Sequence, residues 1–375
     1  ELLDALRREA PSWEWIRISR PPGEEATGQT ESPARETMRR VAGLLPSPFA
    51  RSLAGRLRRR RREASEPFRR SRAAQPDLVF SPFSSTTLLG CDVPFVTIVY
   101  DLQHEAFPQF FDPALLGQRR IEISEVAAEA SGIACISEFV RETFLARTGA
   151  DGSRVRAIPI SLPRRLARPS AEQSATLLAR RGLSAGGYLF YPANFWHHKN
   201  HPRLLEAFAK VLATNRTPGL RLVLSGEETG AGAEADAAAE RLGLGAAVLR
   251  TGYVDDEEFS ALLHDARALV FPSLYEGFGM PVAEALAAGV PVACSGTTSL
   301  PEVAGDAALF FDPTSADDIS RALVEVATLP PERREAMRAA GLRRVARLGG
   351  PADMARRYLD LFESALAAPR SHSSA

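Results

Sequence analysis

Cysteine, lysine and net charge are all scarce in this chain of 375 residues. Its 3 cysteines show no C-x-x-C spacing, which argues against a disulfide framework and suits a reducing cytoplasm. The 46 basic and 46 acidic residues balance, so no overall electric field attracts nucleic acid. No apolar run reaches the ~18 residues that a membrane span needs, and no signal-peptide pattern opens the chain. We therefore expect a cytoplasmic globular protein that binds no nucleic acid.

Apolar, strand-like segments alternate with helical patterns along the whole chain. Continuous apolar strands between helices are typical of buried parallel sheets. The length suggests two domains, and a Pro/Arg/Ser-rich stretch near 161–176 separates two series of strands. The sequence thus predicts an α/β fold of two tandem doubly wound (Rossmann-like) domains that face each other across a cleft. The predicted strands are 13–19, 77–82, 95–102, 132–137 and 155–160, then 189–194, 221–226, 247–252, 268–273, 291–296 and 308–313.

The chain opens on an amphipathic helical pattern, whereas a doubly wound domain ordinarily opens on a strand and a loop. We expect that about one strand and one loop of the first domain precede the printed sequence. The predicted domains are 1–165 and 166–350.

The most informative motif is FPSLYEGFGMPVAEALAAG, from Phe271 to Gly289. A strand breaks into a loop that carries Glu276 and two glycines, and Pro281 then opens an alanine-rich helix. Glycines before a helix start leave backbone amides uncovered, where the helix dipole favours anionic or oxygen-rich ligands. Glu284 lies eight residues after the loop glutamate, about one turn into the helix. This arrangement suits a ligand with both hydroxyls and phosphates, such as a sugar nucleotide.

EGFGMPVAE resembles the E-x7-E motif of family-4 (group 1) retaining glycosyltransferases, which have the GT-B fold. The resemblance, which spans roughly 77–367, implies that Glu276 contacts the donor sugar and Glu284 the nucleotide ribose. It also implies that no catalytic metal or cofactor is needed, and that a final helix within 351–368 packs back on the first domain. The amide cradle for phosphate and sugar would consist of Gly277, Phe278, Gly279 and Met280.

A second cluster, ANFWHHKNHPRLLEAF, begins at residue 193. Lys199 stands just before a predicted helix with Asn200 as N-cap, where its charge would add to the helix dipole and favour a diphosphate. Only Lys199 and Lys210 among the 46 basic residues are lysines, which suggests that a compact ammonium is needed here. The related family typically has an arginine where Asn194 stands, so the second phosphate contact departs from its pattern. His197, His198 and His201 lack a nearby cysteine or carboxylate, which favours a polar rim over a metal site.

Further site residues are implied by the resemblance. In VYDLQHEAFPQFF, from residue 99, His104 is the preferred side chain facing the reacting carbon, and Asp101 either joins it or caps the following turn. In TGYVDDEEFSALLHDA, Tyr253 and Val254 match the segment that holds the nucleotide base. Ser137 is a predicted helix N-cap on the acceptor side.

The stretch from Arg56 to Arg72 carries nine arginines. It is either a solvated helix or loop, or a peripheral contact with the inner face of an anionic membrane. Membrane contact would suit a lipid-linked acceptor.

The sequence predicts a cytoplasmic retaining hexosyltransferase in cell-surface polysaccharide synthesis. By the family resemblance, its donor would be GDP-mannose or a UDP-hexose, and its acceptor a glycan or a lipid-linked glycan. Two alternatives stay open: a GT-B epimerase or hydrolase, and a catalytically degenerate sugar-nucleotide-binding or scaffold protein. A dehydrogenase is disfavoured because no strand is followed by G-x-G-x-x-G.

Overall fold

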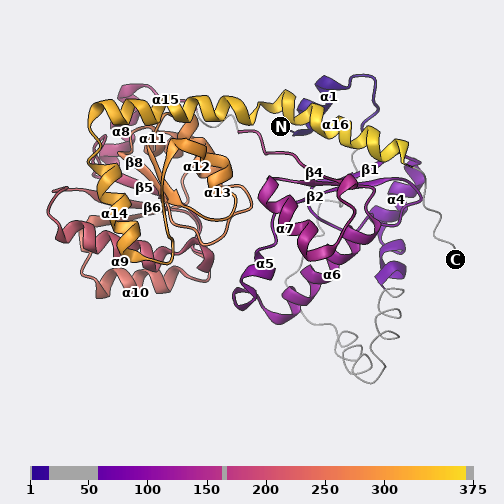
Figure 1. The fold of residues 1–375 in the computed structure, drawn as a ribbon, viewed down its shortest axis with the longest axis horizontal. Helices are drawn as coiled ribbons and strands as arrows, with labels where there is room; N and C mark the ends of the chain where they lie inside the picture. Colours follow the sequence, from indigo (N-terminus) through magenta and orange to yellow (C-terminus); the bar gives the residue numbers. More distant parts are fainter. Residues whose placement is uncertain (1, 17–57, 163–166, 369–375) are drawn as a thin grey trace.

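The computed structural model describes residues 2–16, 58–162 and 167–368. It contains two parallel sheets, one in each half of the chain (Figure 1). The predicted boundary between residues 165 and 166 falls outside the described ranges. None of the described helices is both long and apolar enough to cross a bilayer.

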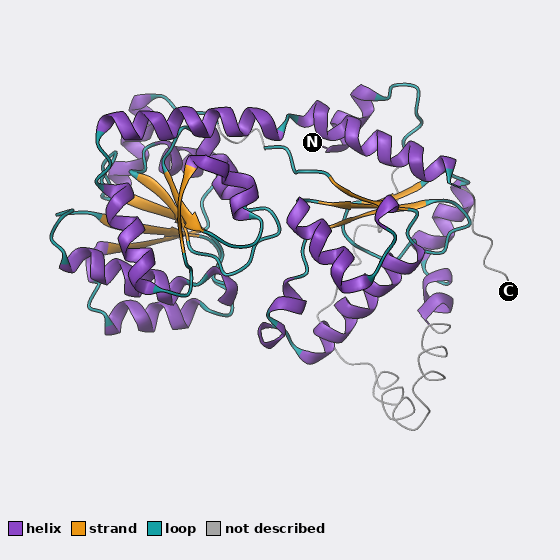
Figure 2. Cartoon of the chain, in the orientation of Figure 1, coloured by secondary structure: helices purple, strands orange, loops and turns teal. Residues whose placement is uncertain are grey.

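The first sheet has four parallel strands in the order β1-β2-β3-β4. Helices α6 (Pro113–Glu129) and α7 (Glu138–Thr148) cover one face, and α1 (Leu2–Glu9) and α16 (Pro351–Ala367) cover the other (Figure 2). The final helix therefore returns from the far end of the chain to the first sheet, where it contacts β2 and β3. The strands are β1 (Val79–Ser81), β2 (Phe95–Val99), β3 (Gly132–Cys135) and β4 (Val155–Ala157).

The second sheet has six parallel strands in the order β10-β9-β8-β5-β6-β7. The jump from β5 to β8 places the ends of these two neighbouring strands, which carry the candidate motifs, side by side. The strands are β5 (Tyr188–Pro192), β6 (Arg221–Ser225), β7 (Val248–Gly252), β8 (Ala268–Phe271), β9 (Val292–Ser295) and β10 (Ala308–Phe311).

Helices cover both faces of this sheet, as expected for buried apolar strands. On one side α9 (His201–Ala213) packs between α10 (Gly232–Arg241) and α14 (Ala316–Ala327). On the other, α8 (Ala171–Arg180) pairs with α11 (Asp256–His264), and α12 (Met280–Ala287) packs against α15 (Pro331–Leu348). The short helix α13 (Leu300–Ala304) lies beside α12.

Ten of the eleven predicted strands are confirmed within a few residues at each end. The prediction for 13–19 is wrong over its described part, because residues 13–16 form no strand and 17–19 lie outside the described ranges. The aromatic rings of this segment pack against each other and against α16 instead. The ring centre of Trp13 lies 5.8 Å from that of Trp15 and 6.2 Å from that of Phe362 in α16. Cys135 and Cys294 are buried in β3 and β9, as predicted.

Candidate functional site

The loop between β8 and α12 carries the candidate site and lies directly against the first domain. An added Cβ at Gly277 would lie 2.0 Å from the carbonyl oxygen of Tyr100, so only glycine fits this approach. Gly279 is the N-cap of α12 with φ of 91°, and a Cβ there would lie 2.3 Å from Leu300. The two glycines of the motif are therefore required by close contacts and by a left-handed turn.

Four consecutive amides in this loop donate no hydrogen bond to any described residue; they belong to Gly277, Phe278, Gly279 and Met280. Phe278 and Gly279 are buried, and a buried backbone N–H is seldom left unpaired in a folded protein. Since α12 begins at Met280, its dipole adds partial positive charge at the same place. The cradle can therefore accept the oxygen atoms of an anion or of a polyol.

Lys199 and Glu276 form an ion pair beside these amides. The Lys199 Nζ donates to Glu276 Oε1 at 2.6 Å, and the two side chains are only 16% and 12% exposed. The ammonium also lies 5.4 Å from the centre of the Phe271 ring. The structure thus joins two residues that the sequence assigns to separate motifs.

Hydrogen bonds to the main chain fix the loop of Lys199, which follows β5, and the loop of Glu276, which follows β8. The hydroxyl of Tyr191, at the end of β5, donates to the Lys199 carbonyl at 2.6 Å. The amide of Leu274 donates to the His198 carbonyl at 2.7 Å. The Glu276 amide donates to Oγ1 of Thr298, in the turn that follows β9, at 3.2 Å. The ion pair is consequently supported on both sides by fixed main chain.

Asn200 occupies the N-cap position of α9, but the expected capping by its side chain is wrong. Its backbone is left-handed, with φ of 64°, and its side chain makes no cap hydrogen bond. Instead its Nδ2 donates to the carbonyls of Pro272 and Pro313, at 3.0 and 2.8 Å. Asn200 therefore ties the Lys199 loop to the ends of β8 and β10.

The remaining donor-side predictions occupy different environments. Asn194 accepts a hydrogen bond from the Glu227 amide at 2.9 Å, so its oxygen supports a neighbouring loop. Glu284 is fully buried in α12, whereas Tyr253, which follows β7, is 74% exposed beside the buried Val254. Their roles toward a nucleotide stay predictions.

Arg250 is a cation that the sequence analysis did not single out. Its guanidinium lies 4.0 Å above the ring of Phe195, the residue after Asn194. It forms ion pairs with Glu228 and Asp236, which neutralise its charge in this structure. The fold therefore brings Arg250 of β7 (Val248–Gly252) beside a residue that follows β5.

The three histidines near Lys199 do not form one rim. His201 is fully buried and stacks on Phe195 at 4.2 Å, and burial lowers its pKa to about 3. Burial and the nearby Lys199 lower the pKa of His198 to about 3 as well. His197 is half-exposed and stacks on Phe110 of the first domain at 5.4 Å. Among the described residues, no three potential metal ligands come together.

Asp101 and His104 follow the end of β2. The Asp101 Oδ1 accepts from the Gln103 amide at 3.0 Å, so this carboxylate closes the turn that leads into the short helix α5 (Gln103–Ala106). His104 is 2% exposed, and neither of its ring nitrogens has a hydrogen-bond partner in the described parts of the chain. Burial lowers its pKa, while Glu105, 3.8 Å from its Nε2, raises it. A neutral imidazole is therefore favoured at this position.

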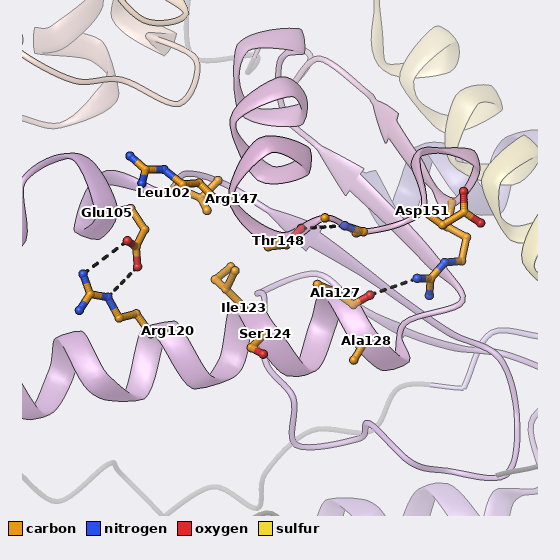
Figure 3. A pocket seen from close by; sticks show the side chains of 13 residues that line it. Leu102, Glu105, Arg120, Ile123, Ser124, Ala127, Ala128, Arg147, Thr148 and Asp151 are labelled. Atoms are coloured by element: carbon orange, nitrogen blue, oxygen red, sulfur yellow. Dashed lines mark hydrogen bonds and ion pairs between the residues drawn. The ribbon is translucent and has the colours of Figure 1, made fainter. Parts of the chain in front are cut away.

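A groove of about 520 Å³ lies between α6 and α7 (Figure 3). At one end Glu105 faces Arg120, whose Nε donates to it at 2.7 Å. Arg154 hydrogen-bonds to the Ala127 carbonyl farther along the groove. All the lining residues belong to the first domain, so this groove is separate from the loop of Lys199 and Glu276.

The arginine-rich stretch is helical at 58–63 and in α4 (Glu66–Ala74); Arg56 and residue 57 lie outside the described ranges. Arg58 and Arg62 both pair with Glu125 of α6, which fixes this segment against the first domain. Part of the positive charge in this stretch is therefore used in ion pairs that hold its helix against α6.

Sequence reasoning missed the polar contacts between the two domains. The Leu102 amide donates to the Tyr275 hydroxyl at 3.3 Å, and Ser137 Oγ donates to the Gly277 carbonyl at 2.7 Å. Glu302 accepts hydrogen bonds from two amides of α7. Ser137 also caps α7 as predicted, since it accepts from the Val140 amide. The sequence shows the motifs that contain these residues, but nothing in the sequence indicates which motif contacts which.

Comparison with known proteins agrees with this architecture. The O-antigen chain mannosyltransferase B of Escherichia coli is 30% identical over 233 residues, which cover 61% of this chain and 60% of the relative. The MMP alpha-(1->4)-mannosyltransferase of Mycolicibacterium hassiacum is 33% identical over 172 residues, covering 45% and 41%. The chain thus spans less than two thirds of either relative.

Solved structures share the fold at lower identity. Sucrose-phosphate synthase from Thermosynechococcus elongatus superposes with a TM-score of 0.67 at 21% identity, covering 81% of this chain and 77% of that one. Anabaena HepE, in complex with UDP and glucose, also gives 0.67, at 15% identity and coverages of 78% and 80%. Residues 184–344 match the family model described as glycosyl transferases group 1. The chain therefore has the GT-B fold, and residues 184–344 are similar to the group 1 glycosyltransferases.

Proposed function

We propose that this protein is a retaining hexosyltransferase that uses a nucleoside diphosphate sugar. The observation that carries the proposal is the run of four amides, Gly277–Met280, that find no hydrogen-bond partner among the described residues and lie beside the Lys199–Glu276 pair. Hydrogen-bond donors and a cation at a helix start suit the diphosphate, and the carboxylate suits the hydroxyls of a sugar.

Charge development supports this assignment. When the bond between the sugar and the diphosphate breaks, negative charge accumulates on the leaving phosphate oxygen. The loop amides and the start of α12 lie beside Lys199, whose ammonium pairs with Glu276 in this structure and would turn to the diphosphate, and preorganised donors stabilise developing charge at little reorganisation cost. A full positive charge and a helix dipole can take the place of a divalent cation, so we propose that no metal is required.

Retention of the anomeric configuration is proposed because EGFGMPVAE resembles the motif of retaining enzymes. The acceptor hydroxyl attacks the anomeric carbon from the face that the diphosphate leaves, and a phosphate oxygen takes the hydroxyl proton. Glu276 orients the sugar hydroxyls and need not form a covalent bond. A double-displacement glycosidase would need two carboxylates about 5 Å apart. Of the two other carboxylates proposed for the site, Asp101 binds the Gln103 amide in a turn and Glu284 is fully buried in α12.

Relatives suggest the substrates. Two of the similar proteins are named mannosyltransferases, and one of them acts on the O-antigen chain by its name. We propose GDP-mannose as donor and a glycan or lipid-linked glycan as acceptor, with a UDP-hexose as the second donor to test. Arg60, Arg61 and Arg69 are exposed on the arginine-rich helices and would supply the proposed peripheral contact with an anionic membrane.

Thermal unfolding of the whole chain with GDP, UDP, ADP or NAD, each with EDTA, tests the donor site. A nucleotide at 100 times its Kd should stabilise the fold by about 2.7 kcal/mol. Stabilisation by GDP or UDP alone supports the proposal and identifies the base. No stabilisation by any of the four contradicts it.

Turnover then separates the enzyme from a protein that only binds the nucleotide sugar. Incubation with GDP-mannose and a mannose-terminated oligosaccharide should give a product with α-linked mannose, seen by NMR of its anomeric proton. Nucleotide binding without transfer to any oligosaccharide or lipid-linked acceptor would favour the scaffold alternative. Release of GDP without an acceptor would favour a hydrolase.

A further inference from the structure

The two neighbours of Glu276 in the chain both contact the other domain. Tyr275 is buried, with its hydroxyl accepting from the Leu102 amide, and its ring packs edge-on against Phe139 at 5.6 Å. Gly277 contacts the Tyr100 carbonyl and accepts a hydrogen bond from Ser137. The position of the Glu276 backbone therefore depends on how the first domain sits against this loop.

Glu302 places a carboxylate in the same interface. Its Oε1 accepts from the Glu138 amide at 2.8 Å, and its Oε2 accepts from the Phe139 amide at 2.9 Å. These amides open α7, a helix of 11 residues, so a carboxylate there also interacts favourably with the helix dipole. Hydrogen bonds to an ionised acceptor are roughly twice as strong as neutral ones.

The carboxylate is supplied from a fixed position in the second domain. Glu302 lies on α13, and Arg344 of α15 donates to the carbonyls of Glu302 and Val303. Arg344 therefore anchors the backbone, while the side chain reaches out of the domain. Among the described residues, the side-chain hydrogen bonds of Glu302 go only to the first domain.

We propose that Glu302 is a positioning residue for the transfer reaction. By docking on the start of α7, it holds the first domain, with His104 and the acceptor side, against the loop that carries Glu276. This inference rests on the proposed function, but its geometric part does not need activity to be tested. Glu302 has no hydrogen bond to Lys199 or Glu276, so its effect on catalysis is indirect.

The test compares Glu302→Ala and Glu302→Gln with the wild-type chain, with Glu335→Ala as control. Glu335 lies on α15, is 63% exposed and, within the described ranges, pairs only with Arg338 of the same helix. Small-angle X-ray scattering reports the arrangement of the two domains, and thermal unfolding titrations report the Kd for GDP or UDP. We expect a larger radius of gyration for Glu302→Ala, with the nucleotide Kd within about twofold of wild type, since the carboxylate serves the other domain.

Transfer kinetics complete the test. We expect kcat to fall at least about tenfold in Glu302→Ala, because small errors in the relative position of reacting groups are costly. Glu302→Gln keeps the reach but only one acceptor oxygen, and should fall between wild type and alanine in both scattering and kcat. The control should match wild type in all three measurements.

Two outcomes overturn the proposal. An unchanged radius of gyration and kcat in Glu302→Ala would show that the contact does not set the domain arrangement. Loss of nucleotide binding together with thermal stability would make Glu302 a structural residue of its own domain. If the wild-type chain transfers no sugar, the proposed function fails, while the scattering comparison still decides the role of Glu302.

Discussion

The ammonium of Lys199 lies 2.6 Å from the Glu276 carboxylate, although the two residues are 77 positions apart in the chain. β5 and β8 are neighbours in the second sheet, so the loops that follow them meet at one edge. The pair places a full positive and a full negative charge beside the four unpaired amides. A nucleotide sugar has the complementary groups: a diphosphate for the cation and hydroxyls for the carboxylate.

Replacing Lys199 should weaken nucleotide binding. In Lys199→Ala we expect the Kd for GDP or UDP to rise about tenfold to a hundredfold, because a hydrogen bond to a charged group contributes roughly 1.5–3 kcal/mol. Lys210→Ala is the matched control: it removes the only other lysine, which is half-exposed and pairs with Asp317. Equal affinities in the two variants would place the diphosphate elsewhere.

Replacing Glu276 should affect turnover more than nucleotide binding. Glu276→Gln keeps the shape of the side chain but loses its charge and the pair with Lys199. We expect kcat to fall by about a hundredfold or more, as when a preorganised electrostatic contact to the reacting group is lost. GDP should still stabilise the variant in thermal unfolding. Wild-type turnover in Glu276→Gln would refute the assignment.

Gly277 should tolerate no side chain. In Gly277→Ala the new Cβ would lie 2.0 Å from the Tyr100 carbonyl oxygen, so the loop or the first domain must shift. We expect kcat to fall at least about tenfold through displacement of the loop. Gly117→Ala is the control, since Gly117 lies in α6 and a Cβ there meets no atom within 4 Å. That variant should keep full activity and gain roughly 0.5–1 kcal/mol of stability.

Burial of His201 predicts a specific pH dependence of stability. Its pKa is lowered to about 3 in the folded protein, against an ordinary value of about 6.5. The unfolded chain therefore binds a proton below pH 6.5 that the folded protein does not. The stability from neutral His201 is fully present above pH 6.5 and is lost as pH falls toward 3. Between pH 7 and pH 5 this loss is about 2 kcal/mol.

The comparison of wild type with His201→Phe isolates this effect. Phenylalanine keeps the stacking on Phe195 but does not titrate. Urea unfolding at pH 7 and pH 5 should therefore show a smaller loss of unfolding free energy in the variant. Equal losses in the two proteins would contradict the burial of a neutral imidazole.

Much of the second domain was predictable from sequence because its strands are apolar and continuous, and each ends in small or turn-forming residues. The loop of Glu276 was readable for the same reason: the spacing of two glutamates, two glycines and a proline is local. Asp101 was left between two roles, and the structure shows that it caps a turn. The sequence pattern is compatible with both roles, because the direction in which the Asp101 side chain points depends on local geometry.

Contacts between distant residues were not predictable in the same way. Trp13 and Trp15 suggested a strand, yet Trp13 packs on Phe362 of α16, far along the chain, and Trp15 stacks on Trp13. The hydrogen bonds from the first amides of α7 to Glu302 depend on how the two sheets are positioned relative to each other. Sequence periodicity describes one element at a time, so it carries no information about such a meeting.

The most direct test of the account is amide hydrogen exchange of the loop, measured by mass spectrometry with and without saturating GDP. We predict that the amides of Gly277–Met280 exchange at least about tenfold more slowly when the diphosphate is bound, since hydrogen bonding protects an amide from exchange. Peptides from α15, outside the site, should be unchanged. Unaltered exchange in the loop, with GDP bound and protection elsewhere, would contradict the donor site proposed for Lys199 and Glu276.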